Sequence, residues 1–353
     1  MKIELPQNAL FALATYLSEQ GPKVGLVVDS LLHDLHEAFS VYRKISPTSS
    51  INKAHEKVAG VSSMLDLLNS WFEFWPLLLC LALFLKEKGE NLEYAIPLKQ
   101  ARFLAPVPKP GKMINAGLNS YDHAREMGIE IPPSGFRPNF FWKGDAQCII
   151  GPAQKIRLSS QFVDWEAEPA IIIGRKARNV KASEAMEIVA GFTCHNDVTD
   201  RDLMIKPDGS LDFLTGKSRD TFGPLGPWII PREFVSHSEG LRIRCFLNDK
   251  IMQDTGTDQL IWGPEQCIAY LSSIITLEPG DVIALGTGAG VGWAKGISVA
   301  KGEFPKIIDH MRRGGGTFLR QGDRIGVEID QIGRLENEVA QGENEGGVKR
   351  CSQ

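Results

Sequence analysis

Several features that would assign this chain to a familiar class of protein are missing from its sequence. Lysine and arginine number 39 against 43 aspartate and glutamate residues, so the formal net charge is -4 and no basic surface for nucleic acid is indicated. The six cysteines show no Cys-x-x-Cys spacing, which argues against a zinc–thiolate site and favours reduced thiols. The N-terminus has neither the basic start nor the apolar core of a signal peptide. We therefore expect a cytoplasmic protein.

An uninterrupted apolar run of membrane-spanning length is also missing. The most apolar segment, residues 71–85, contains Glu73 and Pro76. It is shorter than the ~20 residues that cross a bilayer. A helix buried in the protein, or packed against a second subunit, is the better interpretation. We expect no membrane association.

The length and composition are those of a protein with a sizeable core. With 353 residues, 43% of them hydrophobic, the chain can form one large or two ordinary domains. A proline-rich segment at residues 104–112 marks the expected boundary. We predict a small N-terminal α/β domain over residues 1–105, a larger domain over residues 106–340 and a disordered tail over residues 341–353.

Periodicity predicts a fold of the α+β class that is mostly β. Residues 23–29 and 31–35 have the pattern of two short strands, and residues 61–88 have helical spacing. From about residue 155 to residue 340, short β-type runs alternate with turns, and the clearest helix spans residues 183–190. This pattern favours a largely antiparallel sheet that folds over on itself.

Three acidic residues could meet at the ends of two strands. Glu166 and Glu168 are two residues apart at the start of an apolar β-type run, so their side chains leave the same face of a strand. Asp197 follows a second β-type run and could bring a third carboxylate to that face. Three close carboxylates need protons or a cation, and oxygen-only ligands suit Mg²⁺ first, with Mn²⁺ or Ca²⁺ as alternatives. The ordinary alternative is a solvated acidic face.

A histidine and a glutamate form a second candidate group. His123 and Glu126 are three residues apart on a predicted helical turn, close enough for the carboxylate to orient the imidazole and raise its basicity. A solvated pair at a helix start is the alternative. The Pro- and Gly-rich residues 129–140 would serve as a mobile lid. Lys143 could reach a substrate carboxylate, although a surface lysine is the more common outcome.

Two further segments carry polar groups that could enter a pocket. Lys217 lies between a glycine and a serine in a weakly charged region, where it could act as a cation or proton donor. Residues 280–292 form a β-type run that leads into a glycine-rich turn, where backbone N–H groups and the Thr287 hydroxyl could hold an anionic group. The turn lacks the Lys-Ser/Thr of a nucleotide-binding loop, and no clear amphipathic helix follows it. A nucleotide site is therefore disfavoured.

The order of these motifs resembles the fumarylacetoacetate hydrolase family over roughly residues 104–340. The motifs that carry the resemblance are Gly117-Leu118-Asn119 followed by Asp122-His123-Ala124 and Glu126, Asp164-Trp165-Glu166-Ala167-Glu168, Asn196-Asp197-Val198-Thr199-Asp200-Arg201-Asp202, Gly216-Lys217-Ser218, Pro224-Leu225-Gly226-Pro227-Trp228, and residues 277–287. Residues 24–28 and the pair Asp34-Leu35 are similar to the small N-terminal domain of bacterial members.

The resemblance implies a mixed β-roll catalytic domain, a homodimer and a bound Mg²⁺, Mn²⁺ or Ca²⁺ ion. The residues that correspond by position to the family's site are Glu166, Glu168 and Asp197 for the metal, His123, Glu126 and Lys217 for catalysis, and Arg201, Gly286, Thr287 and Lys143 for substrate binding. The resemblance also implies substrates that are 2-oxo acids or β-diketo acids. These undergo carbon–carbon bond hydrolysis, decarboxylation or isomerisation.

The first functional hypothesis is a metal-dependent hydrolase that cleaves a carbon–carbon bond in an acylpyruvate or fumarylacetoacetate-like acid, in aromatic-compound catabolism. The cation would stabilise an enolate, His123 would activate water, and Lys217 would stabilise the expelled carbanion equivalent. Arg201 and Thr287 would hold the substrate carboxylate. One alternative is a decarboxylase or tautomerase of a 2-oxo acid on the same site. Another is a non-catalytic binding protein, which the complete set of polar residues disfavours.

Three departures from the family pattern concern the expected pocket. Ser120 stands where many members have tyrosine, Met204 replaces a common glutamine, and Gly288 replaces a proline. We expect these changes to shape the pocket for a less polar or bulkier substrate.

Overall fold

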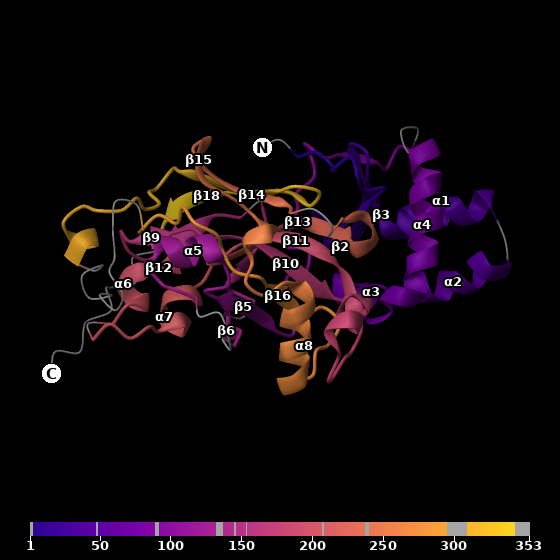
Figure 1. Ribbon diagram of the computed structural model, residues 1–353. Helices are drawn as coiled ribbons and strands as arrows, with labels where there is room; N and C mark the ends of the chain where they lie inside the picture. Colours follow the sequence, from indigo (N-terminus) through magenta and orange to yellow (C-terminus); the bar gives the residue numbers. More distant parts are fainter. Residues whose placement is uncertain are drawn as a thin grey trace.

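The computed structural model describes residues 3–46, 49–88, 92–131, 137–144, 146–152, 154–206, 208–236, 240–294 and 309–342. These residues form a mixed α/β fold that is mostly sheet, as predicted, with helices at both ends of the molecule (Figure 1). The five cysteines among them are free thiols. The tail predicted from residue 341 lies almost wholly outside the described residues, as do residues 132–136 of the predicted lid.

The N-terminal part is an antiparallel meander flanked by helices. Its elements are β1 (Ala12–Ser18), β2 (Gly21–Val28), β3 (Leu31–Asp34), α1 (Leu35–Ile45), α2 (Ser49–Ala59), α3 (Met64–Asn69), α4 (Trp71–Lys88) and β4 (Ile96–Pro97). The two strands predicted at residues 23–29 and 31–35 are β2 and β3. Asp34 ends β3 and starts α1, because its carboxylate accepts hydrogen bonds from the backbone N–H groups of His36 and Glu37.

Helix α4 contains the most apolar run of the sequence. Six of its side chains are buried, among them Trp71, Phe74 and Leu78. They pack in one cluster with residues of β10 and β13 in the main sheet, so the interpretation of this segment as a buried helix is confirmed. Among the described residues, no helix has both the length and the apolar character needed to cross a membrane.

The main sheet joins the N-terminal strands to those of the rest of the chain. Its order is β4-β3-β2-β1-β13-β11-β10-β16-β5-β6, with β7 paired to β13. Its later strands are β5 (Met113–Gly117), β6 (Asn139–Trp142), β7 (Ile149–Ile150), β10 (Ala167–Ile173), β11 (Val189–Asn196), β13 (Gly223–Pro231) and β16 (Val282–Ala284). Because Leu13 of β1 faces Ile229 of β13, one sheet spans the boundary expected near residue 105. A division into two folding units stays a prediction.

A five-stranded sheet covers one face of the main sheet. Its order is β15-β14-β17-β18-β8. Its strands are β8 (Ile156–Leu158), β14 (Arg242–Leu247), β15 (Lys250–Gly256), β17 (Arg324–Ile329) and β18 (Gly333–Gln341). Along β10, Ile171 and Ile173 pack with this sheet, whereas Ala170 and Ile172 pack with α3 and α4. Burial on both faces explains why β10 is apolar after its first residues.

The remaining elements are short, and two helices differ from the sequence prediction. The helix predicted at residues 183–190 is a 3₁₀-helix, η2 (Ala182–Ile188), and it ends at Ile188 because Val189 already pairs in β11. The sequence pattern did not indicate α8 (Pro264–Ile274), which begins with a proline in its first turn. The other elements are α5 (Tyr121–Glu126), β9 (Val163–Asp164), β12 (Thr199–Asp200), α6 (Arg201–Met204), α7 (Phe213–Lys217), η3 (Arg232–Phe234) and η4 (Thr257–Gln259).

Candidate functional site

Two strand ends bring three carboxylates together. Strands β10 and β11 pair so that Ala167 faces Asn196. Glu166 and Glu168 flank the first of these residues, and Asp197 follows the second. One carboxylate oxygen from each acidic residue lies within 4.8 Å of the other two, and all three residues are buried. The structure therefore brings together the three residues that the sequence singled out, and they do not form a solvated face.

Cations neutralise two of the three carboxylates. The Lys217 ammonium donates to Glu166 at 2.8 Å and to Asp197 at 2.7 Å. The Arg201 guanidinium donates to Glu166 at 2.6 Å, and the buried Lys143 ammonium donates to Asp197. Burial alone would raise the pKa of both acids, but the neighbouring cations outweigh it and hold each pKa below its ordinary value. Glu166 and Asp197 are therefore carboxylates at neutral pH.

Glu168 is the carboxyl group of this cluster that lacks a cationic hydrogen-bond donor among the described residues. One of its oxygens accepts from the Gly286 N–H at 2.9 Å, and the other is buried without a hydrogen-bond partner. Burial and the negative charges of Asp197 and Glu166 raise the pKa of Glu168 well above its ordinary value. A hard divalent cation would supply the missing positive charge, and the all-oxygen donor set fits such an ion.

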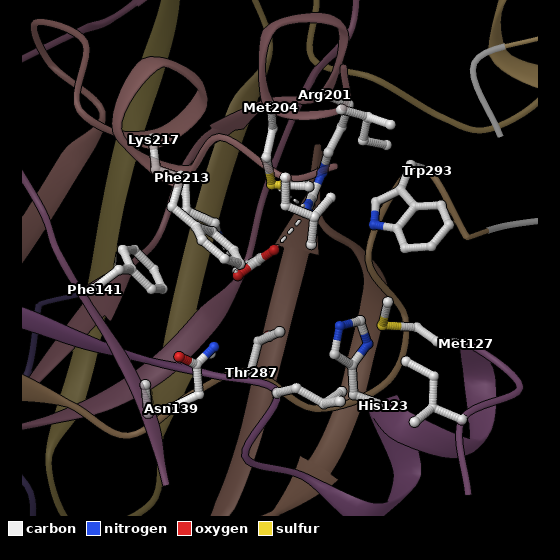
Figure 2. A pocket seen from close by; sticks show the side chains of 17 residues that line it. His123, Met127, Asn139, Phe141, Arg201, Met204, Phe213, Lys217, Thr287 and Trp293 are labelled. Carbon is white, nitrogen blue, oxygen red and sulfur yellow. Dashed lines mark hydrogen bonds and ion pairs between the residues drawn. The ribbon is translucent and has the colours of Figure 1, made fainter. Parts of the chain in front are cut away.

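The second predicted group is also assembled. The imidazole of His123 on α5 lies 3.0 Å from the Glu126 carboxylate through Nδ1, and the other Glu126 oxygen accepts from the Gly290 N–H at 2.9 Å. The glycine-rich turn thus fixes the carboxylate, and the carboxylate fixes the ring. The ring lines a cavity, so the pair is not a solvated one (Figure 2).

Arg201 is held more tightly than the sequence suggested. Its Nε donates to Asp164 at 2.8 Å, in addition to the bond from its Nη2 to Glu166, while its Nη1 points to the Met204 sulfur at 3.8 Å. Asp164 also accepts from the Trp293 N–H at 2.9 Å. Burial raises the pKa of Asp164 to about 6, against the opposing effect of Arg201. Sequence reasoning assigned Asp164 no role, although it lies in the motif that supplies two of the clustered carboxylates.

Two residues expected to contact the substrate are placed elsewhere. The Lys143 side chain is fully buried against Asp197 and the Val198 carbonyl, to which its ammonium donates at 3.0 Å. The Gly286 N–H is taken by Glu168. Both residues therefore act on the carboxylate cluster, and neither presents a free donor to a substrate.

A glutamine that sequence reasoning missed connects the site to the five-stranded sheet. The buried Gln253 side chain on β15 accepts from the Ala167 N–H at 3.0 Å and donates to the Thr287 hydroxyl at 2.8 Å and to the Gly288 carbonyl at 2.9 Å. Gln253 thereby fixes the position of Thr287, which lines the cavity. A single polar residue in a strand carries no sequence signal, and only the pairing of the elements shows its role.

The three residues that depart from the family pattern differ in what they contact. A Cβ at Gly288 would lie 2.4 Å from Thr255, so this glycine serves packing and does not shape the cavity. Ser120 precedes α5, and its hydroxyl bonds to the Asp122 carboxylate instead of capping a backbone N–H. Only Met204 lines the cavity, so the expected loss of polarity is located at this residue.

The cavity has a volume of about 210 Å³ and combines the charged cluster with apolar walls (Figure 2). Glu166, Arg201 and Lys217 line it on the charged side. Phe141 and Phe213 stack with ring centroids 4.7 Å apart, and the Lys217 ammonium lies 5.4 Å from the Phe141 ring centroid. The site can thus hold an anionic group beside an apolar one.

Comparisons with known proteins agree with this geometry. A family described as "Fumarylacetoacetate (FAA) hydrolase C-terminal" matches residues 112–340. The mitochondrial oxaloacetate tautomerase Fahd2a of Rattus norvegicus is 37% identical over 246 residues, which cover 69% of this chain and 71% of the rat protein. The mitochondrial oxaloacetate tautomerase of Xenopus laevis is 38% identical over 256 residues, covering 72% of this chain and 73% of the frog protein.

Among solved structures, this chain is similar to a maleylpyruvate hydrolase from Sphingobium sp. SYK-6 in complex with manganese(II) and pyruvate. The TM-score is 0.66 at 25% identity, covering 94% of this chain and all of the hydrolase chain (100%). The structural similarity therefore extends over nearly the whole chain, including most of the N-terminal part.

Proposed function

This chain belongs to the fumarylacetoacetate hydrolase family, and we propose that it is a divalent-metal-dependent keto–enol tautomerase of a 2-oxo acid. The observation that carries the proposal is the position of the His123–Glu126 pair in the wall of the same cavity as the carboxylate cluster. An acid–base group beside a cation site is what enol formation from a 2-oxo acid requires. The rat and frog relatives, which are named as oxaloacetate tautomerases, support the same chemistry.

The reaction removes a proton from C3 of the 2-oxo acid and adds one to the carbonyl oxygen. Neutral His123 can accept the C3 proton, because Glu126 holds its Nδ1 and stabilises the imidazolium that forms. The Lys217 ammonium can stabilise the negative charge that develops on the carbonyl oxygen and hold a proton there. A divalent ion bound by Glu166, Glu168 and Asp197 would polarise the oxo group as a Lewis acid.

The second candidate is a carbon–carbon bond hydrolase of a β-diketo acid. The similarity to the maleylpyruvate hydrolase structure with manganese(II) and pyruvate supports it. In that reaction His123 would take a proton from water instead of carbon. Mg²⁺ as the ion, a homodimer, a cytoplasmic location and a role in aromatic-compound catabolism stay predictions.

One experiment separates these reactions. The purified protein is mixed with the enol form of a 2-oxo acid, and separately with an acylpyruvate, with added Mg²⁺ or Mn²⁺ or with EDTA. Loss of enol absorbance with unchanged mass indicates tautomerisation, two acid products indicate hydrolysis, and CO₂ indicates decarboxylation. We expect His123→Ala to lower kcat by roughly 10²–10⁴-fold, and the exposed Glu184→Gln to have no effect. Decay no faster than with the metal ion alone would contradict the proposal.

A further inference from the structure

We propose that the 2-oxo acid carries a single carboxylate and an apolar far end, so that a dicarboxylate such as oxaloacetate is a poor substrate. This inference rests on the proposed function and deepens it. Two independent features of the cavity carry it: the balance of buried charges beside the cavity, and the residue types of the walls away from the charges.

Acidic side chains outnumber cationic ones beside the cavity. The clustered side chains are the carboxyl groups of Asp164, Glu166, Glu168 and Asp197 and the cations of Lys143, Arg201 and Lys217. Glu126 beside His123 adds a fifth carboxyl group. A second carboxylate on the substrate would be an uncompensated charge in a buried site.

The cations that line the cavity are already paired. Among the described lining residues these are Arg201, Lys217 and, when protonated, His123. Lys217 bonds two carboxylates, and His123 bonds Glu126. Arg201 bonds two carboxylates through Nε and Nη2, and its Nη1 has only a thioether contact. A substrate carboxylate placed at that Nη1 uses the guanidinium donor that bonds no carboxylate. Among the described lining residues, a second carboxylate would meet only neutral donors, such as those of Asn139 and Thr287.

The cavity walls away from the cluster are mostly apolar. Their apolar side chains include those of Leu118, Met127, Ile129, Met204, Leu211 and Phe213, and Asn139 and Thr287 are neutral polar side chains among the described lining residues. Figure 2 shows Met127 beside the His123 ring and Phe213 near Phe141. Leu118 has a left-handed backbone with φ of 51°, which is an unfavourable conformation for a bulky residue. The backbone is therefore strained at a residue that lines the cavity. Such walls favour an alkyl or aryl end over a hydrated carboxylate.

The test is calorimetric binding of two 2-oxo acids that have nearly the same shape. In 5-methyl-2-oxohexanoate the far end is an isopropyl group, and in 2-oxoglutarate it is a carboxylate. With the protein saturated by Mn²⁺, we expect the isopropyl acid to bind at least tenfold more tightly. Equal or tighter binding of 2-oxoglutarate would overturn this inference and leave the proposed function intact. Binding of Mn²⁺ but of neither acid would contradict the proposed function as well.

A matched pair of variants tests the role of the wall. Leu211→Lys places a cation at a lining residue that is 36% exposed, so the change is compatible with folding. Leu214→Lys makes the same change three residues away, at a 65% exposed side chain outside the cavity lining. We expect Leu211→Lys to shift the affinity ratio at least tenfold towards 2-oxoglutarate and Leu214→Lys to leave it unchanged. Equal ratios in the two variants would overturn the inference.

Discussion

Neutralising Glu168 should stabilise the metal-free protein and weaken its binding of a divalent ion. Glu166 and Asp197 each bond two cationic side chains, whereas Glu168 bonds a backbone N–H and leaves one oxygen without a partner. In the metal-free protein Glu168 must either carry an uncompensated buried charge or hold a proton at neutral pH. Glu168→Gln removes this cost, and the variant also removes one ligand of the proposed ion.

The size of the effect follows from the carboxyl group. An unfolded glutamate has a pKa of about 4.3, so holding its proton at pH 7 costs up to about 3.5 kcal/mol. Because the amide accepts a weaker hydrogen bond from the Gly286 N–H, we expect Glu168→Gln to raise the free energy of unfolding by about 1–3 kcal/mol. With 353 residues, each kcal/mol shifts the unfolding midpoint by roughly 1–1.5 °C. The pKa of Glu168 is raised in the folded state. The difference in unfolding free energy between Glu168→Gln and the wild type should therefore shrink as the pH falls towards about 4.3.

Thermal unfolding with EDTA and with Mn²⁺ measures both effects. An ion at 100 times its Kd stabilises the wild type by about 2.7 kcal/mol, roughly a 4 °C rise, and Glu168→Gln should lose most of that rise. The exposed Glu184→Gln is the control and should behave as the wild type. If Glu168→Gln lowered the metal-free midpoint at pH 7 and kept the full response to Mn²⁺, the assignment of Glu168 as the uncompensated ligand would be refuted.

Three other changes test separate parts of the structure. Burial lowers the pKa of His33 to about 4, so stability should be lost as the pH falls from about 6.5 to 4, and His33→Gln should flatten that slope in unfolding experiments. Asp164→Asn weakens the anchor of Arg201 and should raise KM about 10-fold or more with a smaller effect on kcat, whereas unchanged steady-state kinetics would contradict a positioning role. Gly288→Ala introduces a Cβ too close to Thr255 and should destabilise the protein by about 1–3 kcal/mol in denaturant titration.

The parts of the site that the sequence predicted are those in which spacing determines geometry. A period of two places Glu166 and Glu168 on one face of an extended chain, and a spacing of three places His123 against Glu126 within one helical turn. These relations are local, so they do not depend on how the rest of the chain folds. That Asp197 joins them depends on the pairing of β10 with β11, which the sequence suggested only through two β-type runs.

The parts that the sequence did not predict depend on distant elements. Gln253 reaches the site because β15 brings it there. Lys143 was predicted as a substrate contact, but it follows β6 and donates to Asp197 instead. No local sequence pattern indicates either contact. The glycine-rich turn was predicted to bind an anion, but its Gly286 and Gly290 N–H groups bond to Glu168 and Glu126. The sequence showed that the turn has donors, and only the fold shows that the acceptors are the protein's own carboxylates.

The ion pairs of these carboxylates imply an order in which the metal ion and the substrate bind. In the metal-free protein Lys217 donates to Glu166 and Asp197, and the cluster has no surplus of positive charge to attract an anionic 2-oxo acid. A divalent ion held by Glu166, Glu168 and Asp197 would supply positive charge for the carboxylate and the oxo group of the substrate. Metal binding should therefore precede substrate binding, and the affinity for a 2-oxo acid should be measurable only in the metal-loaded protein.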